Sequence, residues 1–150
     1  MTAQRPKVAP DARAARISSA AFAAGGAVAV FCGIASILTG TPNVAHDLAP
    51  VTGPADLLAR IAQIAPIMSA ALGAIVVLGI AAMLASTRLE PRAAALELLI
   101  LGLAIDVCIG GATGRVGHAT DGAVMGSAVV CLMGGTAVVA GGIIAVLGRE

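Results

Sequence analysis

One carboxylate lies in a stretch that is otherwise uncharged and strongly apolar, and its chemistry is the most unusual in the chain. Asp106 stands within the run Leu-Ala-Ile-Asp-Val-Cys-Ile. An ionised carboxylate at the centre of a bilayer costs at least ~2.5–3.5 kcal/mol, and no Lys or Arg lies deep in any apolar stretch to pair with it. Two roles fit Asp106. It is either a neutral acid that hydrogen-bonds between helices, or a group that takes up and releases a proton or cation during transport.

The helical face that carries Asp106 is small and polar. Gly102, Gly110 and Thr113 would lie on the same side of an α-helix, and such a face suits contact with another helix better than contact with lipid. The expected hydrogen-bond partners are serines that fall at a similar depth in the other apolar stretches: Ser36, Ser69 and Ser127.

No group of residues has the spacing of a catalytic site. Glu97 and Asp106 fall on opposite sides of one helix, so they cannot act as a carboxylate pair in acid–base chemistry. The glycine-rich segment 110–114 lacks the Gly-Lys-Ser/Thr ending of a phosphate-binding loop. We therefore expect a protein without enzymatic activity and without a cofactor.

The cysteines and histidines do not predict a metal site. The three cysteines lie in apolar stretches without the close spacing of a ligand motif, and each is expected to pack as a small apolar residue: Cys32, Cys108 and Cys131. His46 with Asp47, and His118 with Asp121, fall in polar loops, where four such ligands would suit zinc if they converged. Loop histidines are ordinarily solvated, so we expect no metal.

The composition requires a lipid environment. Of the 150 residues, 59% are hydrophobic and only 11% are charged, whereas a soluble domain has about 25% charged residues. The net charge is +1 and the only aromatic residues are two phenylalanines, which leaves neither a basic face nor a stacking platform for nucleic acid. The fold class expected is all-α: a polytopic membrane protein in a lipid bilayer.

The apolar stretches predict a four-helix transmembrane bundle over residues 17–148. A helix needs about 20 residues to cross the hydrocarbon core, and the predicted spans are residues 17–39, 64–86, 91–114 and 123–147. Residues 1–16, which are basic and contain prolines, predict a disordered tail. Pro54 is predicted to begin a short amphipathic helix along the interface, with Pro66 bending the chain into the second span.

The distribution of basic residues predicts the orientation. With the N-terminus inside, the inner side carries Arg5, Lys7, Arg13, Arg16, Arg88, Arg92 and Arg149, and the outer side carries Arg60 and Arg115. This bias places both termini, including the 1–16 tail, in the cytoplasm. The preference for Ala, Gly and Arg indicates a bacterial source, and therefore the inner membrane.

Small residues at a spacing of four predict close helix association. Lipid tails are as apolar as leucine, so membrane helices associate where small side chains let their backbones approach. Gly122 and Gly126 form such a pair, and Gly141 continues a small face in the same span. We expect a homo-oligomer or a complex with other membrane subunits. The leading hypothesis is a non-enzymatic membrane subunit or scaffold, and the alternative is a small oligomeric proton- or cation-coupled transporter that uses Asp106.

Overall fold

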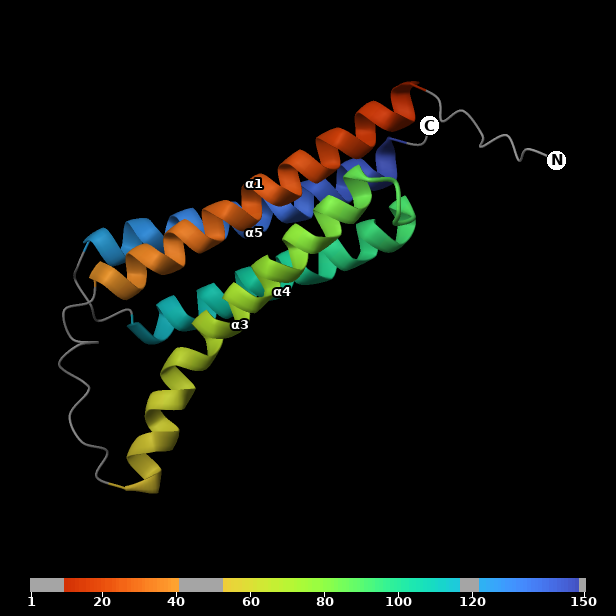
Figure 1. Cartoon of the computed structure of the whole chain (residues 1–150). Helices are drawn as coiled ribbons and strands as arrows, with labels where there is room; N and C mark the ends of the chain where they lie inside the picture. The colour runs from red at the N-terminus through yellow and green to blue at the C-terminus, as the bar shows by residue number, and fades with distance from the viewer. Residues whose placement is uncertain (1–9, 41–52, 117–121, 149–150) are drawn as a thin grey trace.

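The chain folds into long α-helices that pack side by side in one bundle (Figure 1). The computed structural model describes residues 10–40, 53–116 and 122–148. Its helices are α1 (Pro10–Gly40), α3 (Pro54–Ala85), α4 (Pro91–Val116) and α5 (Gly122–Leu147). All four are long and apolar enough to cross a membrane. The predicted all-α, four-helix transmembrane bundle is therefore confirmed.

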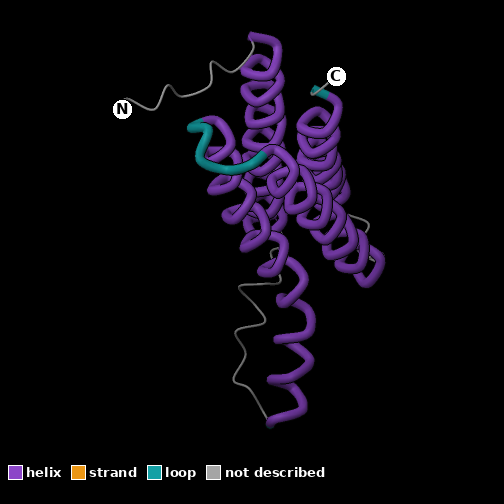
Figure 2. The backbone as a smooth tube through the Cα atoms, turned by 90° about the vertical axis from the view of Figure 1, so that its right-hand side faces the viewer, coloured by secondary structure: helices purple, strands orange, loops and turns teal. Residues whose placement is uncertain are grey.

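Each helix packs against two neighbours, and α5 lies between α1 and α4. The first and last helices run side by side along the bundle, as Figures 1 and 2 show. The interior is filled by aliphatic residues from all four helices, among them Val30, Val77, Leu98 and Val138, none of which is exposed. Large apolar side chains also cover the outside, which is the pattern of a bundle solvated by lipid.

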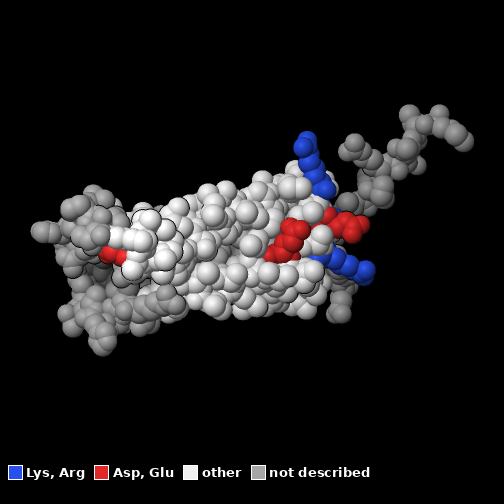
Figure 3. Space-filling view, turned by 90° about the horizontal axis from the view of Figure 1, so that it is seen from below, with Lys and Arg blue, Asp and Glu red and all other residues white. Residues whose placement is uncertain are grey.

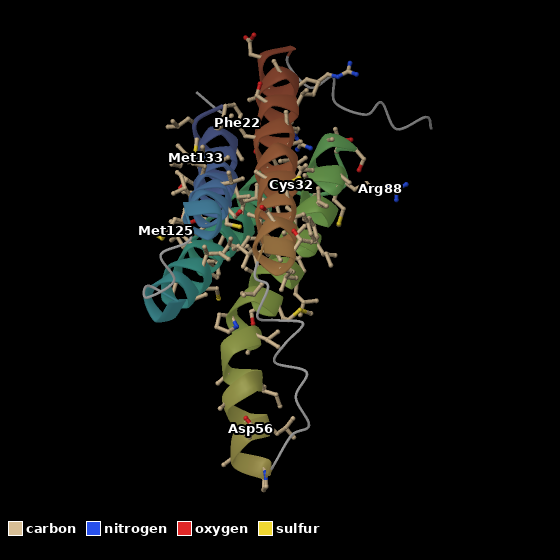
Figure 4. The ribbon with its side chains drawn as sticks, turned by 90° about the vertical axis from the view of Figure 1, so that its left-hand side faces the viewer. Phe22, Cys32, Asp56, Arg88, Met125 and Met133 are labelled. Carbon is tan, nitrogen blue, oxygen red and sulfur yellow. The ribbon has the colours of Figure 1, made fainter. Side chains whose placement is uncertain are left out.

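The charged residues gather at the two ends of the bundle. In the face seen in Figure 3, the middle of the molecule is free of Lys, Arg, Asp and Glu, and these residues appear only towards the ends. Figure 4 shows Asp56 at the free end of α3 and Arg88 at the opposite side of the molecule. Apart from Asp106, the described charged residues thus lie towards the ends of the bundle, which matches the profile of a bilayer.

Helix α1 begins earlier than the predicted first span. It starts at Pro10, so residues 10–16, which were expected to belong to a disordered tail, are helical. Proline is favoured at the first position of a helix, because its missing N–H would have no intrahelical partner there. Asp11 follows in the first turn, where a negative charge is stabilised by the helix dipole. Residues 1–9 lie outside the described part of the chain.

Helix α3 is continuous through Pro66, so the predicted interfacial segment and the predicted second span belong to one helix. Pro54 occupies the first turn, as expected from its sequence position. Figure 1 shows that the first part of α3, in yellow, bends away from the bundle, while the green part packs against it. Proline inside a helix removes one backbone donor and bends the axis.

The turn between α3 and α4 is built on a residue in the left-handed conformation. Thr87 has φ 60°. Its N–H donates to Leu84 O at 3.2 Å, and the N–H of Arg88 donates to Met83 O at 3.0 Å. This is the Schellman arrangement, which normally uses glycine at the position of Thr87. A β-branched residue is strained there.

Candidate functional site

Two pairs of adjacent glycines give α5 its contacts with both neighbours. Gly134 and Gly141 face α1: a Cβ on Gly134 would lie 2.6 Å from Gly26 O, and one on Gly141 would lie 2.9 Å from Ser19 O. Gly135 and Gly142, the next residues in each pair, face α4 instead. Adjacent residues on a helix point about 100° apart. In each pair, one glycine therefore lies in the α1–α5 interface and the next lies in the α4–α5 interface at the same height along α5.

A buried hydrogen bond accompanies the α1–α5 contact. The Ser19 hydroxyl, which is not exposed, donates to Gly141 O at 2.6 Å. Because Gly141 has no side chain, the α1 backbone approaches closely enough for this bond to form. Gly141, one of the predicted packing residues, therefore lies in the α1–α5 interface.

The other predicted packing glycines are not in the interior of the bundle. Gly126 is exposed, and a Cβ built on it would meet nothing within 4 Å. Gly122 is the first residue of α5, but its surroundings lie outside the described side chains. Among the described residues, Gly126 therefore makes no close helix contact.

Asp106 lies on α4 at the seam with α5, and its two carboxyl oxygens have different surroundings. Oδ2 is 3.4 Å from the hydroxyl oxygen of Thr136. Oδ1 is buried and has no hydrogen-bond partner among the described residues. It rests against Gly135, in the space that a Cβ at that position would fill. The carboxyl group is thus held between a hydroxyl and a bare stretch of backbone.

The Thr136 hydroxyl has a second, closer acceptor. Its Oγ1 lies 2.8 Å from Leu132 O, one turn back on α5. A hydroxyl carries a single proton, and the shorter distance favours donation to Leu132 O. The lone pairs of Oγ1 then remain for Asp106. Only a carboxyl group that carries a proton can donate to them, so this geometry suits the neutral acid.

The hydrogen-bond partner described for Asp106 is Thr136 rather than one of the three predicted serines. The hydroxyl of Ser127 on α5 donates to that of Ser36 on α1 at 2.7 Å, and Ser69 on α3 is exposed. Ser127 and Thr136 are about two and a half turns apart and so lie on opposite sides of α5. The position of Ser127 along its span predicts that it lies at the depth of Asp106. The rotation of α5 about its own axis instead brings Thr136 to Asp106.

The remaining reactive side chains are dispersed. Cys131 is buried against Val30 O, at 3.6 Å from its Sγ, while Cys32 is exposed and Cys108 is partly buried. Glu97 is exposed on α4. In the part of the chain that the structure describes, no three His, Cys, Asp or Glu residues are grouped as metal ligands. The loop residues His46, Asp47, His118 and Asp121 fall outside the described part of the chain.

The fold and the seam define a class of protein: a multi-pass membrane protein built as a four-helix bundle, with one carboxyl group held between two of its spans. No family model, curated protein or solved structure matches the chain. The functional argument therefore rests on the site itself.

Proposed function

We propose that this protein is a non-enzymatic membrane subunit or scaffold that works by associating with further helices through small residues. The observation that carries the proposal is a set of outward-facing glycines within the membrane helices. A Cβ on any of these would meet nothing within 4 Å among the described residues: Gly25, Gly79, Gly111 and Gly126.

These glycines lower helix propensity without improving the packing of the bundle. Glycine inside a helix is less favourable than alanine by about 1 kcal/mol. Gly26 and Gly134 offset that cost by letting α1 and α5 approach closely. Among the described residues the outward glycines make no such close contact, whereas a second helix lying on them would supply it. The partner is a copy of this chain or another membrane subunit.

The test compares oligomer size for Gly126→Ile and for a matched change at Ala104, an exposed small residue on α4. We expect the wild type to form an oligomer in lipid nanodiscs, seen by native mass spectrometry. Gly126→Ile should shrink it without lowering the thermal stability of the bundle, and Ala104→Ile should leave it intact. A wild type that is monomeric, binds no co-expressed subunit and is indifferent to both changes would contradict the proposal.

We propose the bacterial inner membrane as the location, with both termini in the cytoplasm. The basic residues at one end support this orientation. The Arg16 guanidinium donates to Leu89 O at 3.5 Å, so the start of α1 and the α3–α4 turn lie at the same end of the bundle. Arg88 and Arg92 belong to that end as well, which agrees with the positive-inside rule.

Asp106 supports a second candidate, a small oligomeric proton- or cation-coupled transporter. Its Oδ1 atom is buried in the span without a hydrogen-bond partner among the described residues, and ionisable groups inside membrane helices commonly mark ion pathways. Proteoliposome proton flux tests this candidate. Asp106→Asn should abolish coupled flux while Glu97→Gln, which alters an exposed carboxylate of the same helix, preserves it. Equal flux in the wild type and Asp106→Asn would eliminate the transporter.

A further inference from the structure

The first part of α3 projects from the bundle and makes little contact with it. The first buried residue of the helix is Ala70, and the described side chains before it are exposed or only partly buried. Figures 1 and 2 show this part leaving the side of the bundle while the other three helices stay together. In Figure 1 it is bent obliquely away from the bundle axis, and in Figure 2 it extends beyond the end of the bundle.

The length of α3 also indicates that the helix has two parts, which meet near Pro66. The helix has 32 residues, which at 1.5 Å per residue is about 48 Å. The part from Pro66 to Ala85 is about 30 Å long and by itself covers the hydrocarbon core, which is about 30 Å thick. The turns before Pro66 are therefore surplus to the crossing and must lie beyond the core.

These surplus turns carry an apolar stripe. Leu57, Ile61 and Ile64 follow one another at helical spacing and are 47%, 53% and 47% exposed, and Leu58 beside them is 66% exposed. Past Pro66 the stripe continues through Met68 and Leu72, which are also exposed. In the span, that stripe is the side of α3 that meets lipid. Asp56 lies off it, towards the adjacent side of the helix.

We propose that residues 54–65 form an interfacial helix that lies on the membrane surface, with the apolar stripe inserted at the boundary between headgroups and acyl chains. The occupant of the stripe is lipid, because the stripe runs without a break into the lipid-facing side of the same helix. The leaflet is the one at the end where α1 finishes at Gly40. The segment then departs from the direction of the span near Pro66, where the helix bends.

The interfacial helix supplies an anchor that the composition otherwise lacks. Membrane proteins commonly fix their depth with Trp and Tyr at the interfaces, and this chain has neither residue. At the opposite end, Arg13 and Arg16 lie in the first turns of α1, where they can reach phosphate groups. The bundle would thus be held by basic residues at one surface and by an amphipathic helix at the other.

The absence of tryptophan makes the test direct, because one introduced Trp is the only indole signal. Ile61→Trp places it on the stripe, and Ala59→Trp places it on the opposite side at another exposed position. Leu72→Trp is a reference within the span. Each variant is studied in nanodiscs bounded by an aliphatic polymer, which adds no indole and leaves both membrane surfaces open to water. The quenchers are iodide and lipids brominated either near the headgroup or near the chain end.

We expect Ile61→Trp to be quenched by the lipid brominated near the headgroup, with a severalfold smaller iodide quenching constant than Ala59→Trp. Leu72→Trp should respond to the deeper bromine. Leu58→Trp provides a second probe of the stripe if Ile61→Trp folds poorly. Iodide quenching of Ile61→Trp equal to that of Ala59→Trp would put the segment in water and overturn the proposal. Protection of Ile61→Trp from both kinds of quencher would show a protein partner on the stripe and overturn it equally.

Discussion

The Oδ1 atom of Asp106 occupies the space that a side chain at residue 135 would need. Helix α5 can accept the carboxyl group of α4 only because Gly135 has no Cβ. A glycine Cα–H directed at a carboxyl oxygen is a weak hydrogen-bond donor, and no other donor reaches Oδ1 within the described residues. The acid and the glycine are therefore one structural unit, and each restricts what the other position can hold.

Gly135→Ala should consequently destabilise the bundle. The added methyl group would overlap the Asp106 carboxyl, and overpacking of this kind typically costs about 1–3 kcal/mol. Thermal unfolding in mild detergent measures the effect. For the protein dispersed as a monomer, Gly126→Ala is the matched control on the same helix, since a methyl group there meets no described atom within 4 Å, and it should be neutral or slightly stabilising. Equal stability of the two variants would show that Asp106 does not rest on Gly135.

Asp106→Asn should leave the stability of the bundle close to that of the wild type. The amide can keep its carbonyl oxygen against Gly135 and direct its N–H groups at Thr136 Oγ1, as the neutral acid would. Asp106→Leu loses the interhelical bond, which averages about 0.6 kcal/mol in membrane proteins. Reversible unfolding of both variants provides the comparison. A larger loss for Asn than for Leu would indicate that the native carboxyl group is ionised.

Thr87→Gly should stabilise the protein by about 1 kcal/mol, because a left-handed conformation costs roughly that much for a residue with a Cβ. The two turn hydrogen bonds, from Thr87 and Arg88, use only backbone atoms and would survive the change. The control is Ser86→Gly, at a residue with φ −78° whose hydroxyl donates to Met83 O at 3.0 Å. That change should destabilise the turn. A lower melting temperature for Thr87→Gly than for the wild type would show that the left-handed conformation of Thr87 does not strain the turn.

Reporter fusions test the orientation. A reporter after Arg149 should be active in the cytoplasm, and one inserted between residues 43 and 52 should be active outside, as the distribution of basic residues predicts. Replacing Arg88 and Arg92 by Gln should weaken this bias and yield a mixed population. A C-terminal reporter on the outer side would reverse the proposed topology.

The sequence was sufficient for the helices because lipid imposes a length and a composition on every span. Pro54 and Pro91 begin α3 and α4, as proline at the first helical position predicts. The prolines within residues 1–16 predict a disordered tail, whereas Pro10 in fact begins α1. A proline does either, depending on which residues follow it.

The partners of Asp106 could not be predicted in the same way. Depth along a span follows from counting residues, but the rotation of each helix about its own axis follows from packing. Ser127 was at a suitable depth, yet it faces α1, where Ser36 is bonded to it. The adjacent glycines indicate the rotation of α5. Gly134 and Gly135 define the α1 and α4 sides of α5, and Thr136, which directly follows them, lies on the α4 side.

The position of α5 between α1 and α4 has a consequence for biogenesis. Helix α1 is synthesised before α5, which carries the glycines that receive it, Gly134 and Gly141. Until then the close-contact surface of α1 around Gly26 has no cognate partner, and Asp106 on α4 awaits Gly135. A nascent chain that stops before α5 would therefore present both an unmatched helix surface and an uncovered carboxyl group to the membrane's quality-control proteases. Insertion of α5 is the step that completes both contacts.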